Sequence, residues 1–322
     1  MSSHPDQQLR VLITGATGYV GARLSHSLLT KGMKVRMTSR KPLPPLPVFE
    51  GAEWASLDFA SLNKTSLSAA LKNVDAVVHL AALNDQQCRE NPELALRVNG
   101  FGTQQLLEAA TENGVSQFLY FSTAHVYGTP LVGKFSEDSP TQPMSHYTIT
   151  HRVAEDYVLA SPLKKKQVFR LSNAIGAPLL PETNCWMLLV NDLCRQAVKT
   201  GRLVLKTHGL QLRNFLSLAA VEDATFQTLQ TPHSPEKIVN LVGMNKSIRE
   251  MAELIHQKAQ KILNQSLVLE MPLASANEQE QALESRLEIQ SRLPLDHSLA
   301  EAQLSRAVEE TLAFCQKYKD QI

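Results

Sequence analysis

A short glycine-rich segment, Val11 to Gly21 (VLITGATGYVG), holds the residues whose types and spacing point most directly to chemistry. An apolar run precedes the glycines and leucines at helical spacing follow them, and in this strand–turn–helix context such glycines bind a dinucleotide. Gly15 permits the tight turn, Gly18 lets the backbone approach a pyrophosphate, and Gly21 lets the helix pack on the strand. The start of the helix then offers N–H groups to the phosphates. The segment predicts a dinucleotide site, against the alternative of a glycine-rich loop without a ligand.

Strands and helices are expected to alternate through the first half of the chain, because apolar runs are followed by segments with leucine or alanine at helical spacing. Such alternation is typical of a parallel sheet with helices on both faces, whose ligands bind at the carboxyl ends of the strands. Those ends carry Gly15, Arg40, Asp58, Ala81 and the pair Ser122-Thr123. The expected strands cover residues 10–14, 33–39, 53–57, 74–80, 117–121 and 167–171, and the expected helices end near residue 30 or cover 61–71, 91–110 and 147–159.

The alternation weakens after residue 171, which indicates a second part of the chain. The predicted fold class is α/β, a doubly wound parallel sheet of the Rossmann type with a smaller C-terminal α/β lobe. Residues 1–171 form the dinucleotide-binding domain in this prediction, and residues 172–322 form the substrate lobe, with segments within about 207–245 returning to the Rossmann sheet. Later helices are expected at 185–200, 247–262 and 299–318, and later strands at 203–206, 237–242 and 267–270.

Composition excludes several classes of function. The 322 residues are 43% hydrophobic and 20% charged, with a formal net charge of +1, so no electrostatic argument favours nucleic acid or an anionic membrane as a partner. No apolar run approaches the roughly 18 residues of a membrane span, and the polar N-terminus is unlike a signal peptide. No metal site is expected, because the cysteines lack metal-ligand spacing and are expected to be reduced thiols in a cytoplasmic protein. They are Cys88, Cys185, Cys194 and Cys315.

Six segments of the chain match the motifs of a known family, in the order and at the spacings of that family. They are GATGYVG, VDAVVHLAA, VNGFGTQQLLEAA, FSTAHVYG, RLSNAIGAP and GLQLRNFLSLAAVEDA. Over nearly its whole length the chain resembles the extended short-chain dehydrogenase/reductases, in the group of nucleotide-sugar epimerases and dehydratases. The resemblance implies an NAD(P)-dependent oxidoreductase, epimerase or dehydratase acting on a nucleotide-activated sugar. It also implies a homodimer joined through the helices expected at 91–110 and 147–159.

The resemblance also implies which residues are catalytic. In the family a serine or threonine before the V-Y-G triplet polarises the substrate oxygen, and here it is Thr123, with Ser122 beside it. The active tyrosine opens a helix as Y-x-x-x-K, and here it is Tyr147. A tyrosine has a pKa of about 10 in water, so it moves a proton near pH 7 only when its phenolate is stabilised. The family's lysine, one helical turn further on, stabilises the phenolate and holds the nicotinamide ribose.

His151 stands where the family has that lysine. An imidazole is shorter than a lysine side chain and is ordinarily neutral at pH 7, so it acidifies Tyr147 far less than an ammonium group does. Three interpretations stay open. Protonated His151 substitutes at a slower rate or with a lower pH optimum, or another group such as His125 or His146 supplies the proton, or the site binds its ligands without turnover.

The end of the second expected strand bears on the choice of dinucleotide. It reads Thr38-Ser39-Arg40-Lys41 and contains no acidic residue. An acid there would bond the adenosine ribose and favour NAD(H), whereas an arginine favours a 2′-phosphate, so NADP(H) is favoured and NAD(H) is the alternative. The competing interpretation is that Arg40 stacks on adenine or lies in solvent. Asp58 matches the family's aspartate at the adenine amino group, although it also suits a helix N-cap.

The remaining site residues follow from the same comparison of motifs. Arg213 matches the arginine that grips the substrate's diphosphate, a task suited to a rigid fork of donors, and Asn214 replaces the aspartate that usually follows it. The expected substrate-binding residues are Thr123, His125, Asn173 and Arg213. The expected cofactor-binding residues are Gly15, Thr17, Gly18, Tyr19, Val20, Gly21, Arg40, Asp58, Phe59, Leu80, Ala81, Ala82, Asn99, Tyr147 and His151.

Two other functions are compatible with this sequence. One is an NADPH-dependent reductase of a simple ketone or aldehyde, which suits Arg40 but leaves Arg213 unexplained. The other is a non-catalytic protein that binds a dinucleotide, for which His151 is the main support. The loops at 83–91, 125–144 and 178–187 are expected to select the sugar, but no pattern in them identifies it.

Overall fold

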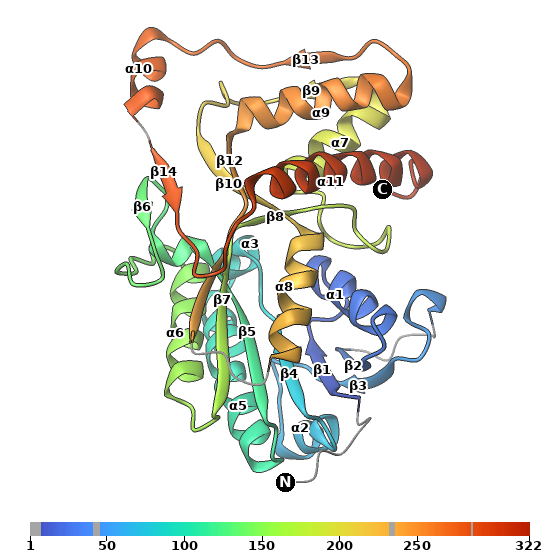
Figure 1. The fold of residues 1–322 in the computed structure, drawn as a ribbon, viewed down its shortest axis with the longest axis vertical. Helices are drawn as coiled ribbons and strands as arrows, with labels where there is room; N and C mark the ends of the chain where they lie inside the picture. The colour runs from blue at the N-terminus through green and yellow to red at the C-terminus, as the bar shows by residue number, and fades with distance from the viewer. Residues whose placement is uncertain (1–7, 41–45, 232–235, 285) are drawn as a thin grey trace. The chain divides into compact units, whose positions relative to one another are not determined.

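The computed structural model describes residues 8–40, 46–231, 236–284 and 286–322 (Figure 1). The proline-rich segment at 42–47 (PLPPLP) therefore lies mostly outside the described residues. The chain packs as two compact units: unit 1 contains 1–126, 141–170 and 222–239, and unit 2 contains 127–140, 171–221 and 240–322. The assignment of 1–171 to the cofactor and 172–322 to the substrate stays a prediction, because packing defines these units and ligands do not.

A seven-stranded sheet organises unit 1, in the order β11-β7-β5-β4-β1-β2-β3. The pairs that join β3, β2, β1, β4 and β5 are all parallel. The strand order reverses between β1 and β4, which is where doubly wound sheets bind ligands. The predicted fold class is confirmed. The strands are β1 (Arg10–Thr14), β2 (Lys34–Ser39), β3 (Glu53–Ser56), β4 (Ala76–His79), β5 (Gln117–Thr123), β7 (Lys165–Leu171) and β11 (Ile238–Leu241).

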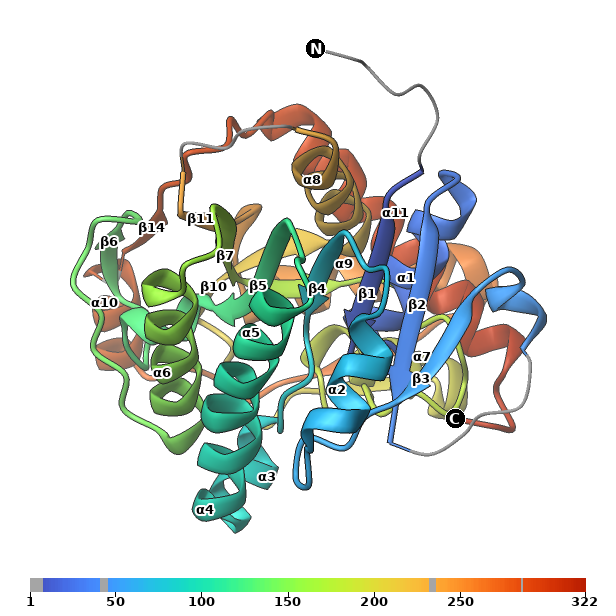
Figure 2. The same ribbon diagram turned by 90° about the horizontal axis from the view of Figure 1, so that it is seen from below.

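Helices α2, α5 and α6 cover one face of this sheet (Figure 2). Helices α1 and α8 lie side by side, joined by an ion pair of 2.8 Å between Arg23 and Glu222. The helix expected over 91–110 is divided by a π-helical turn, Leu96–Phe101, and the loop expected at 83–91 contains a short helix, α3. The helices are α1 (Tyr19–Thr30), α2 (Lys64–Leu71), α3 (Asp85–Glu90), α4 (Pro92–Ala95), α5 (Gly102–Glu112), α6 (His146–Ala160) and α8 (Leu218–Gln230).

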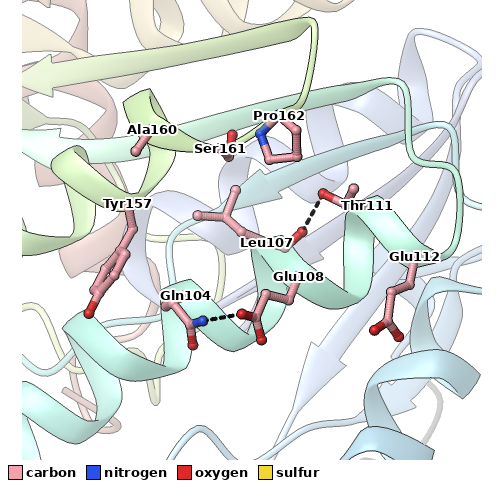
Figure 3. Close-up of a pocket in the computed structure, with 9 residues that line it drawn as sticks. All are labelled: Gln104, Leu107, Glu108, Thr111, Glu112, Tyr157, Ala160, Ser161 and Pro162. Carbon is pink, nitrogen blue, oxygen red and sulfur yellow. Dashed lines mark hydrogen bonds between the residues drawn. The ribbon is translucent and has the colours of Figure 1, made fainter.

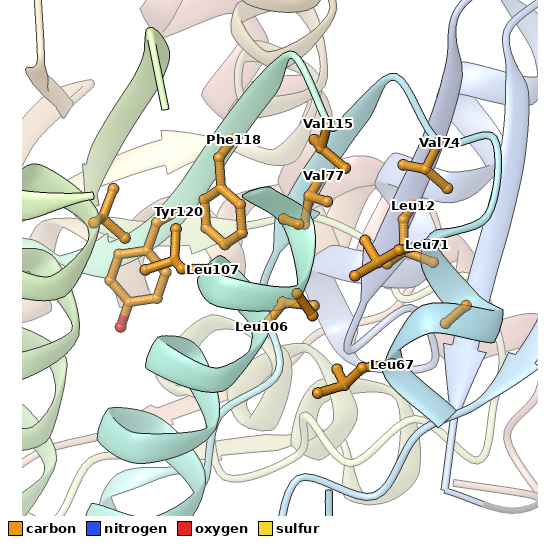
Figure 4. Close-up of a cluster of buried hydrophobic side chains, with 14 of the residues drawn as sticks. Leu12, Leu67, Leu71, Val74, Val77, Leu106, Leu107, Val115, Phe118 and Tyr120 are labelled. Carbon is orange, nitrogen blue, oxygen red and sulfur yellow. The ribbon is translucent and has the colours of Figure 1, made fainter. Parts of the chain in front are cut away.

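The apolar core of unit 1 lies between the sheet and helices α2, α5 and α6 (Figure 4). Leu12, Val77 and Phe118 project from three neighbouring strands, and Leu71 and Leu106 face them from two helices, all with no exposed surface. Burial of a side chain of this size stabilises the fold by roughly 1.5–3 kcal/mol. This packing fixes where β1, β4 and β5 end, and therefore where the polar residues that follow these strands lie.

A buried ion pair holds helix α6 against the sheet. Glu155 of α6 is fully buried and Arg170 of β7 is 3% exposed, and two guanidinium nitrogens of Arg170 lie 2.7 and 3.0 Å from the two carboxylate oxygens. Ser122 of β5 donates to the same carboxylate at 2.5 Å. Removing one partner of such a pair costs roughly 3–5 kcal/mol. The helix that carries Tyr147 and His151 is thereby tied to β5 and β7.

Unit 2 combines small sheets with a helical core. Its largest sheet has the order β12-β10-β8, and Leu193 of α7, Ile255 of α9 and Leu312 of α11 are at most 1% exposed within one apolar cluster. The strands are β6 (Gly133–Phe135), β8 (Asn173–Ile175), β9 (Arg202–Val204), β10 (Leu212–Ser217), β12 (Met244–Ser247), β13 (Val268–Glu270) and β14 (Leu287–Ile289), and the helices are α7 (Leu189–Thr200), α9 (Ile248–Leu263), α10 (Ala276–Glu284) and α11 (His297–Lys317).

The structure departs from the expected elements mainly in unit 2. The sequence does not predict β6, β8, β12 and β14, because strands of three or four residues give no measurable periodicity. The helix expected from residue 185 begins at Leu189. Within 207–245, β10 belongs to a sheet of unit 2, whereas β11 joins the seven-stranded sheet.

Three features of the described residues bear on the classes of function excluded above. None of their helices has the length and apolar character needed to span a membrane. Nowhere in the described ranges do three His, Cys, Asp or Glu side chains gather as a metal site. The four cysteines are buried free thiols.

Candidate active site

The glycine turn between β1 and α1 has the geometry that a dinucleotide phosphate needs. Gly15 has a φ of +67°, and a Cβ there would lie 2.9 Å from the backbone nitrogen of Ala81. A Cβ on Gly21 would lie 2.2 Å from the carbonyl oxygen of Gly15. Among the described residues no side chain caps the start of α1 at Gly18, and the first turn of the helix holds no acid. The positive end of the helix dipole is therefore not neutralised and would attract a ligand anion. These residues fit a bound dinucleotide.

Thr14, the last residue of β1, ties the end of its strand to the end of β4. Its Oγ1 accepts from the N–H groups of Leu80 and Ala81, each at 3.2 Å. The same oxygen lies 2.6 Å from Nδ1 of His79. Phe59 stacks on the His79 ring, with the centroids 5.2 Å apart. Three of the expected cofactor residues, Phe59, Leu80 and Ala81, thus lie around one buried imidazole.

The hydrogen bonds of His79 define its tautomer. The hydroxyl of Thr103 lies 2.6 Å from the carbonyl oxygen of Asn99, which only accepts, so the hydroxyl donates there. It then accepts from Nε2 of His79 at 2.8 Å, and Nδ1 accepts from Thr14. Burial, with a contribution from neighbouring His151, lowers the pKa of His79 to about 3. The imidazole is therefore neutral and fully bonded.

Asn99 links helix α6 to the segment after β4. It lies in the π-helical turn, a feature that often occurs at functional sites, and it is 1% exposed. Its Oδ1 accepts from the Leu83 N–H at 2.8 Å, and its Nδ2 donates to the Thr150 hydroxyl at 3.0 Å. Asn99 therefore ties α6 to the segment after β4, and its role at the cofactor or in the active site stays a prediction.

Arg40 and Asp58 lie just beyond the carboxyl ends of β2 and β3, where the sequence predicts them. The Arg40 side chain is exposed. Asp58 accepts from the Ala60 N–H at 3.1 Å and from the Ser61 hydroxyl at 3.3 Å, as in a turn. The N-cap of α2 is Asn63, whose side chain accepts from the first helical turn. The helix-cap interpretation of Asp58 is wrong, and its role at adenine stays a prediction.

Tyr147 and Thr123 are the central pair of the candidate site. Tyr147 lies in the first turn of α6, and Thr123 is the last residue of β5. Desolvation raises the pKa of Tyr147 to about 12, and a hydrogen bond with Thr123 opposes that rise. Tyr147 is therefore a phenol at neutral pH. A phenol held beside a hydroxyl is placed to donate a proton to an oxygen bound between them.

His151 lies one helical turn after Tyr147, with the two ring centroids 4.5 Å apart and the rings edge to face. The side chain is 4% exposed, and burial lowers its pKa to about 4. Its Nδ1 lies 2.7 Å from the hydroxyl of Tyr120, and its Nε2 has no hydrogen-bond partner within the described ranges. A neutral imidazole thus occupies the lysine position, and one of its two nitrogens is unpaired among the described residues. This argues against a protonated His151 near pH 7.

The other expected catalytic residues differ in their surroundings. The Ser122 hydroxyl is engaged by the buried carboxylate of Glu155, so a catalytic role for Ser122 stays a prediction. The hydroxyl oxygen of Thr123 accepts from the backbone N–H of His125 at 3.2 Å. His146 is exposed at the start of α6. A role for either histidine as the proton donor stays a prediction.

Tyr120 and His79 are buried polar residues of the site that sequence reasoning does not single out. Each sits inside an otherwise apolar strand, Tyr120 in QFLYF and His79 in AVVHL. Burying a polar group without a hydrogen bond is costly, so such an interruption is a usable signal that a specific partner exists. It does not reveal which residue that partner is.

Asn173 and Arg213, two expected substrate residues, are neighbours within unit 2. Asn173 of β8 pairs with Phe215 of β10, and its Nδ2 donates to the carbonyl oxygen of Asn214 at 2.9 Å. Arg213 is exposed on β10, so its permanently charged guanidinium is accessible to an anion.

The departure from the family's aspartate at Asn214 has a local explanation. Its Nδ2 donates to the carbonyl oxygen of Gly243 at 2.9 Å and to Asn245 Oδ1 at 2.8 Å, and its Oδ1 accepts from the Gly243 N–H at 2.8 Å. An ionised aspartate only accepts, so it would lose the two donated bonds. Asparagine therefore suits the turn between β11 and β12.

Known proteins share sequence and fold with this chain over most of its length. The sequence model of the NAD dependent epimerase/dehydratase family matches residues 11–242. The dTDP-D-glucose 4,6-dehydratase of Mus musculus is 29% identical over 263 residues, 77% of this chain and 72% of that protein. The dTDP-6-deoxy-L-talose 4-dehydrogenase (NAD(P)(+)) of Kitasatospora kifunensis is 26% identical over 78% of this chain and 79% of its own. The structure of UDP-glucuronic acid 4-epimerase from Bacillus cereus in complex with NAD superposes with a TM-score of 0.73 at 21% identity over 98% of each chain, which shows a common fold.

We predict that two buried histidines make the cofactor-free protein less stable in mild acid. Both titrate near pH 6.5 in an unfolded chain, but His79 titrates near 3 and His151 near 4 in the folded one. The unfolded state therefore binds more protons below about pH 6.5, and stability falls as the pH drops. Between pH 7.5 and pH 5 each histidine should cost about 2 kcal/mol of unfolding free energy. Urea unfolding at the two pH values measures the loss.

Two variants isolate the contribution of His151. His151→Gln should lose about 2 kcal/mol less than the wild type over this range, because glutamine does not titrate. His297→Gln, at an exposed position, should keep the wild-type loss. Equal losses in the wild type and His151→Gln would contradict a buried, neutral His151.

Proposed function

This chain belongs to the NAD dependent epimerase/dehydratase family, and on that basis we propose that it oxidises, epimerises or dehydrates a nucleotide-activated sugar with NAD(P). The observation that carries the proposal is the placement of Tyr147, in the first turn of α6, beside Thr123 at the end of β5. The glycine turn at the end of β1 supports a dinucleotide in the same unit. The names of its relatives, a dTDP-sugar dehydratase and a dTDP-sugar dehydrogenase, support the substrate class.

The proposed chemistry divides between the dinucleotide and this chain. The bound nicotinamide takes or returns a hydride. Thr123 donates a hydrogen bond to the substrate oxygen, and Tyr147 gives or removes its proton. Because Tyr147 rests as a phenol, it is ready to donate, and removing a proton requires stabilisation of the phenolate. His151, which stands in place of the usual lysine, is neutral and supplies no positive charge for that purpose. Arg213 of unit 2 supplies a fixed charge for a diphosphate.

We predict that wild-type oxidation of a nucleotide sugar rises with pH up to 9, with no inflection near pH 6.5. Neutral His151 does not titrate in that range, and the phenol of Tyr147 must lose its proton. His151→Lys should move the rise to lower pH, because an ammonium group stabilises a phenolate. Absorbance at 340 nm from pH 5.5 to 9, with NADP and NAD over a panel of nucleotide sugars, measures both profiles.

Tyrosine variants and the shape of the profile test the assignment of roles. Tyr147→Phe should slow turnover by roughly 10²- to 10⁴-fold, whereas Tyr157→Phe, at an exposed position of the same helix, should leave it unchanged. A wild-type rate that fades as the pH rises through about 6.5 would instead support a protonated His151. Equal activity in Tyr147→Phe and the wild type would reject Tyr147 as the acid/base.

NADP(H) is our proposed preference over NAD(H). Arg40 is exposed directly after β2, the end of that strand carries no acid, and a relative named as using NAD(P)(+) supports tolerance of the phosphate. The Arg40→Asp variant should bind NADPH about tenfold or more weakly, because a charge-assisted hydrogen bond contributes roughly 1.5–3 kcal/mol. Fluorescence titration with NADPH and NADH measures both affinities.

The matched control for Arg40 is Lys34, an exposed base at the opposite end of the same strand. Lys34→Asp should leave both affinities unchanged, because it removes a positive charge far from the carboxyl end of the sheet. Tighter binding of NADH than of NADPH by the wild type would overturn the proposed preference.

A non-catalytic dinucleotide-binding protein is the second candidate function. The observation that favours it is the buried, neutral state of His151, since a phenolate without a neighbouring charge is hard to form. Dinucleotide binding by the wild type without turnover, together with turnover by His151→Lys, would select this candidate.

We also propose that the chain forms a homodimer through the surface of α5, α6 and the π-helical turn. Leu96, Phe101 and Ile149 of this surface are 50%, 55% and 43% exposed. A cavity of about 530 Å³ on the same two helices is lined by α5, by Tyr157 and by the residues at the end of α6 (Figure 3). Apolar side chains gathered in this way are typical of interaction sites, and a second copy would cover them.

Sedimentation velocity at micromolar concentration should report a dimer for the wild type. Phe101→Asp should give a monomer, because a carboxylate would be buried in the interface. Val204→Asp, at an exposed valine of unit 2, is the control and should remain dimeric. A wild-type monomer would contradict the proposal.

A further inference from the structure

A hydrogen bond links Tyr120, a buried tyrosine of β5, to His151, the buried histidine at the position of the usual lysine. Tyr120 of β5 is 1% exposed, and its hydroxyl lies 2.7 Å from Nδ1 of His151. We infer that Tyr120 is a positioning residue that fixes the tautomer of His151, so that Nε2 carries the proton and acts as a neutral donor to a ribose hydroxyl of the dinucleotide. This role rests on the proposed function, because it gives His151 the ribose-binding part of the lysine's task without the charge.

The protonation state of the pair follows from counting donors and acceptors. Burial, and then the negative charge of Glu155, raise the pKa of Tyr120 well above 10, so the phenol keeps its proton. Among the described residues, Nδ1 of His151 is the one acceptor recorded for that proton. A neutral imidazole whose Nδ1 accepts carries its own proton on Nε2.

The opposite arrangement leaves more groups unsatisfied. If Nδ1 carried the proton and donated to the phenol oxygen, the Tyr120 proton would have no acceptor among the described residues and Nε2 would be an unpaired acceptor. Two buried groups would then lack partners, compared with one in the inferred arrangement. The neighbouring imidazole follows the same pattern, because Nδ1 of His79 accepts from Thr14 and Nε2 donates to Thr103.

The atom that remains without a hydrogen-bond partner in the described part of the chain, Nε2 of His151, is the inferred donor to the ligand. Nε2 of His151 is buried and has no partner within the described residues, while the Tyr147 ring packs edge to face with the imidazole at 4.5 Å. An unpaired buried donor is unfavourable until an acceptor arrives. A ribose hydroxyl is such an acceptor, and it needs no charge opposite it. Binding of the dinucleotide would remove the unfavourable energy of the unpaired Nε2 donor, and this gain would contribute to the affinity.

Nitrogen NMR of the cofactor-free protein tests the tautomer without any reaction. With ¹⁵N-labelled histidine, long-range proton–nitrogen correlations distinguish a protonated Nε2 from a protonated Nδ1. The wild type should show His151 as a single tautomer with the proton on Nε2. Tyr120→Phe should show a mixture of tautomers or a shift to Nδ1, because nothing then donates to Nδ1. A wild-type His151 protonated on Nδ1, or an unchanged tautomer in Tyr120→Phe, would overturn the inference.

Dinucleotide affinity gives a second readout with a matched control. Tyr120→Phe should weaken binding about tenfold, the size expected from one lost hydrogen bond. Tyr127→Phe is the control, because Tyr127 is also a buried tyrosine that donates one bond of 2.8 Å, to Asn240. It should change affinity less than twofold, and equal weakening in the two variants would reject a positioning role. If the wild type shows the inferred tautomer but no turnover, the tautomer role stands and the proposed enzyme fails.

Discussion

Polar groups buried at the carboxyl ends of β1, β4 and β5 must find hydrogen-bond partners inside the protein, and the candidate site depends on how they do so. Thr14 bridges the ends of two strands and accepts both backbone N–H groups that follow β4. His79 donates to the Thr103 hydroxyl, which donates to the carbonyl oxygen of Asn99. The side chain of Asn99 then donates to Thr150 on α6. One continuous set of bonds thus joins the glycine turn to α6, the helix that carries Tyr147.

Burial also determines the charge of His151, which occupies the position where the family usually has a lysine. An ammonium group there would acidify the neighbouring tyrosine by its charge, whereas burial keeps His151 neutral and raises the pKa of Tyr147. In the proposed function the site keeps a hydrogen-bond donor at this position and lacks the electrostatic stabilisation that a lysine supplies. Tyr120 bonds one imidazole nitrogen of His151, and the other nitrogen has no partner among the described residues.

Two buried contacts keep this arrangement rigid. The ion pair of Glu155 and Arg170 ties α6 to the sheet, and Ser122 adds a bond from β5. In unit 2 the amide of Asn214 plays a comparable part, since its three bonds hold the turn before β12 next to the strand that carries Arg213. Side chains that would be candidates for catalysis from their motif alone, such as Ser122, serve in the fold as partners of buried groups.

The sequence by itself determined the fold class and the glycine turn, because long alternating segments and glycine spacing are local properties of the chain. It also located Tyr147, Thr123 and His151 through their motifs. Only the tertiary structure decided that His151 is neutral and that Tyr120 is its partner, since 31 residues separate the two in the chain. The pKa of a side chain depends on burial and on groups brought from distant segments, and no local pattern encodes either.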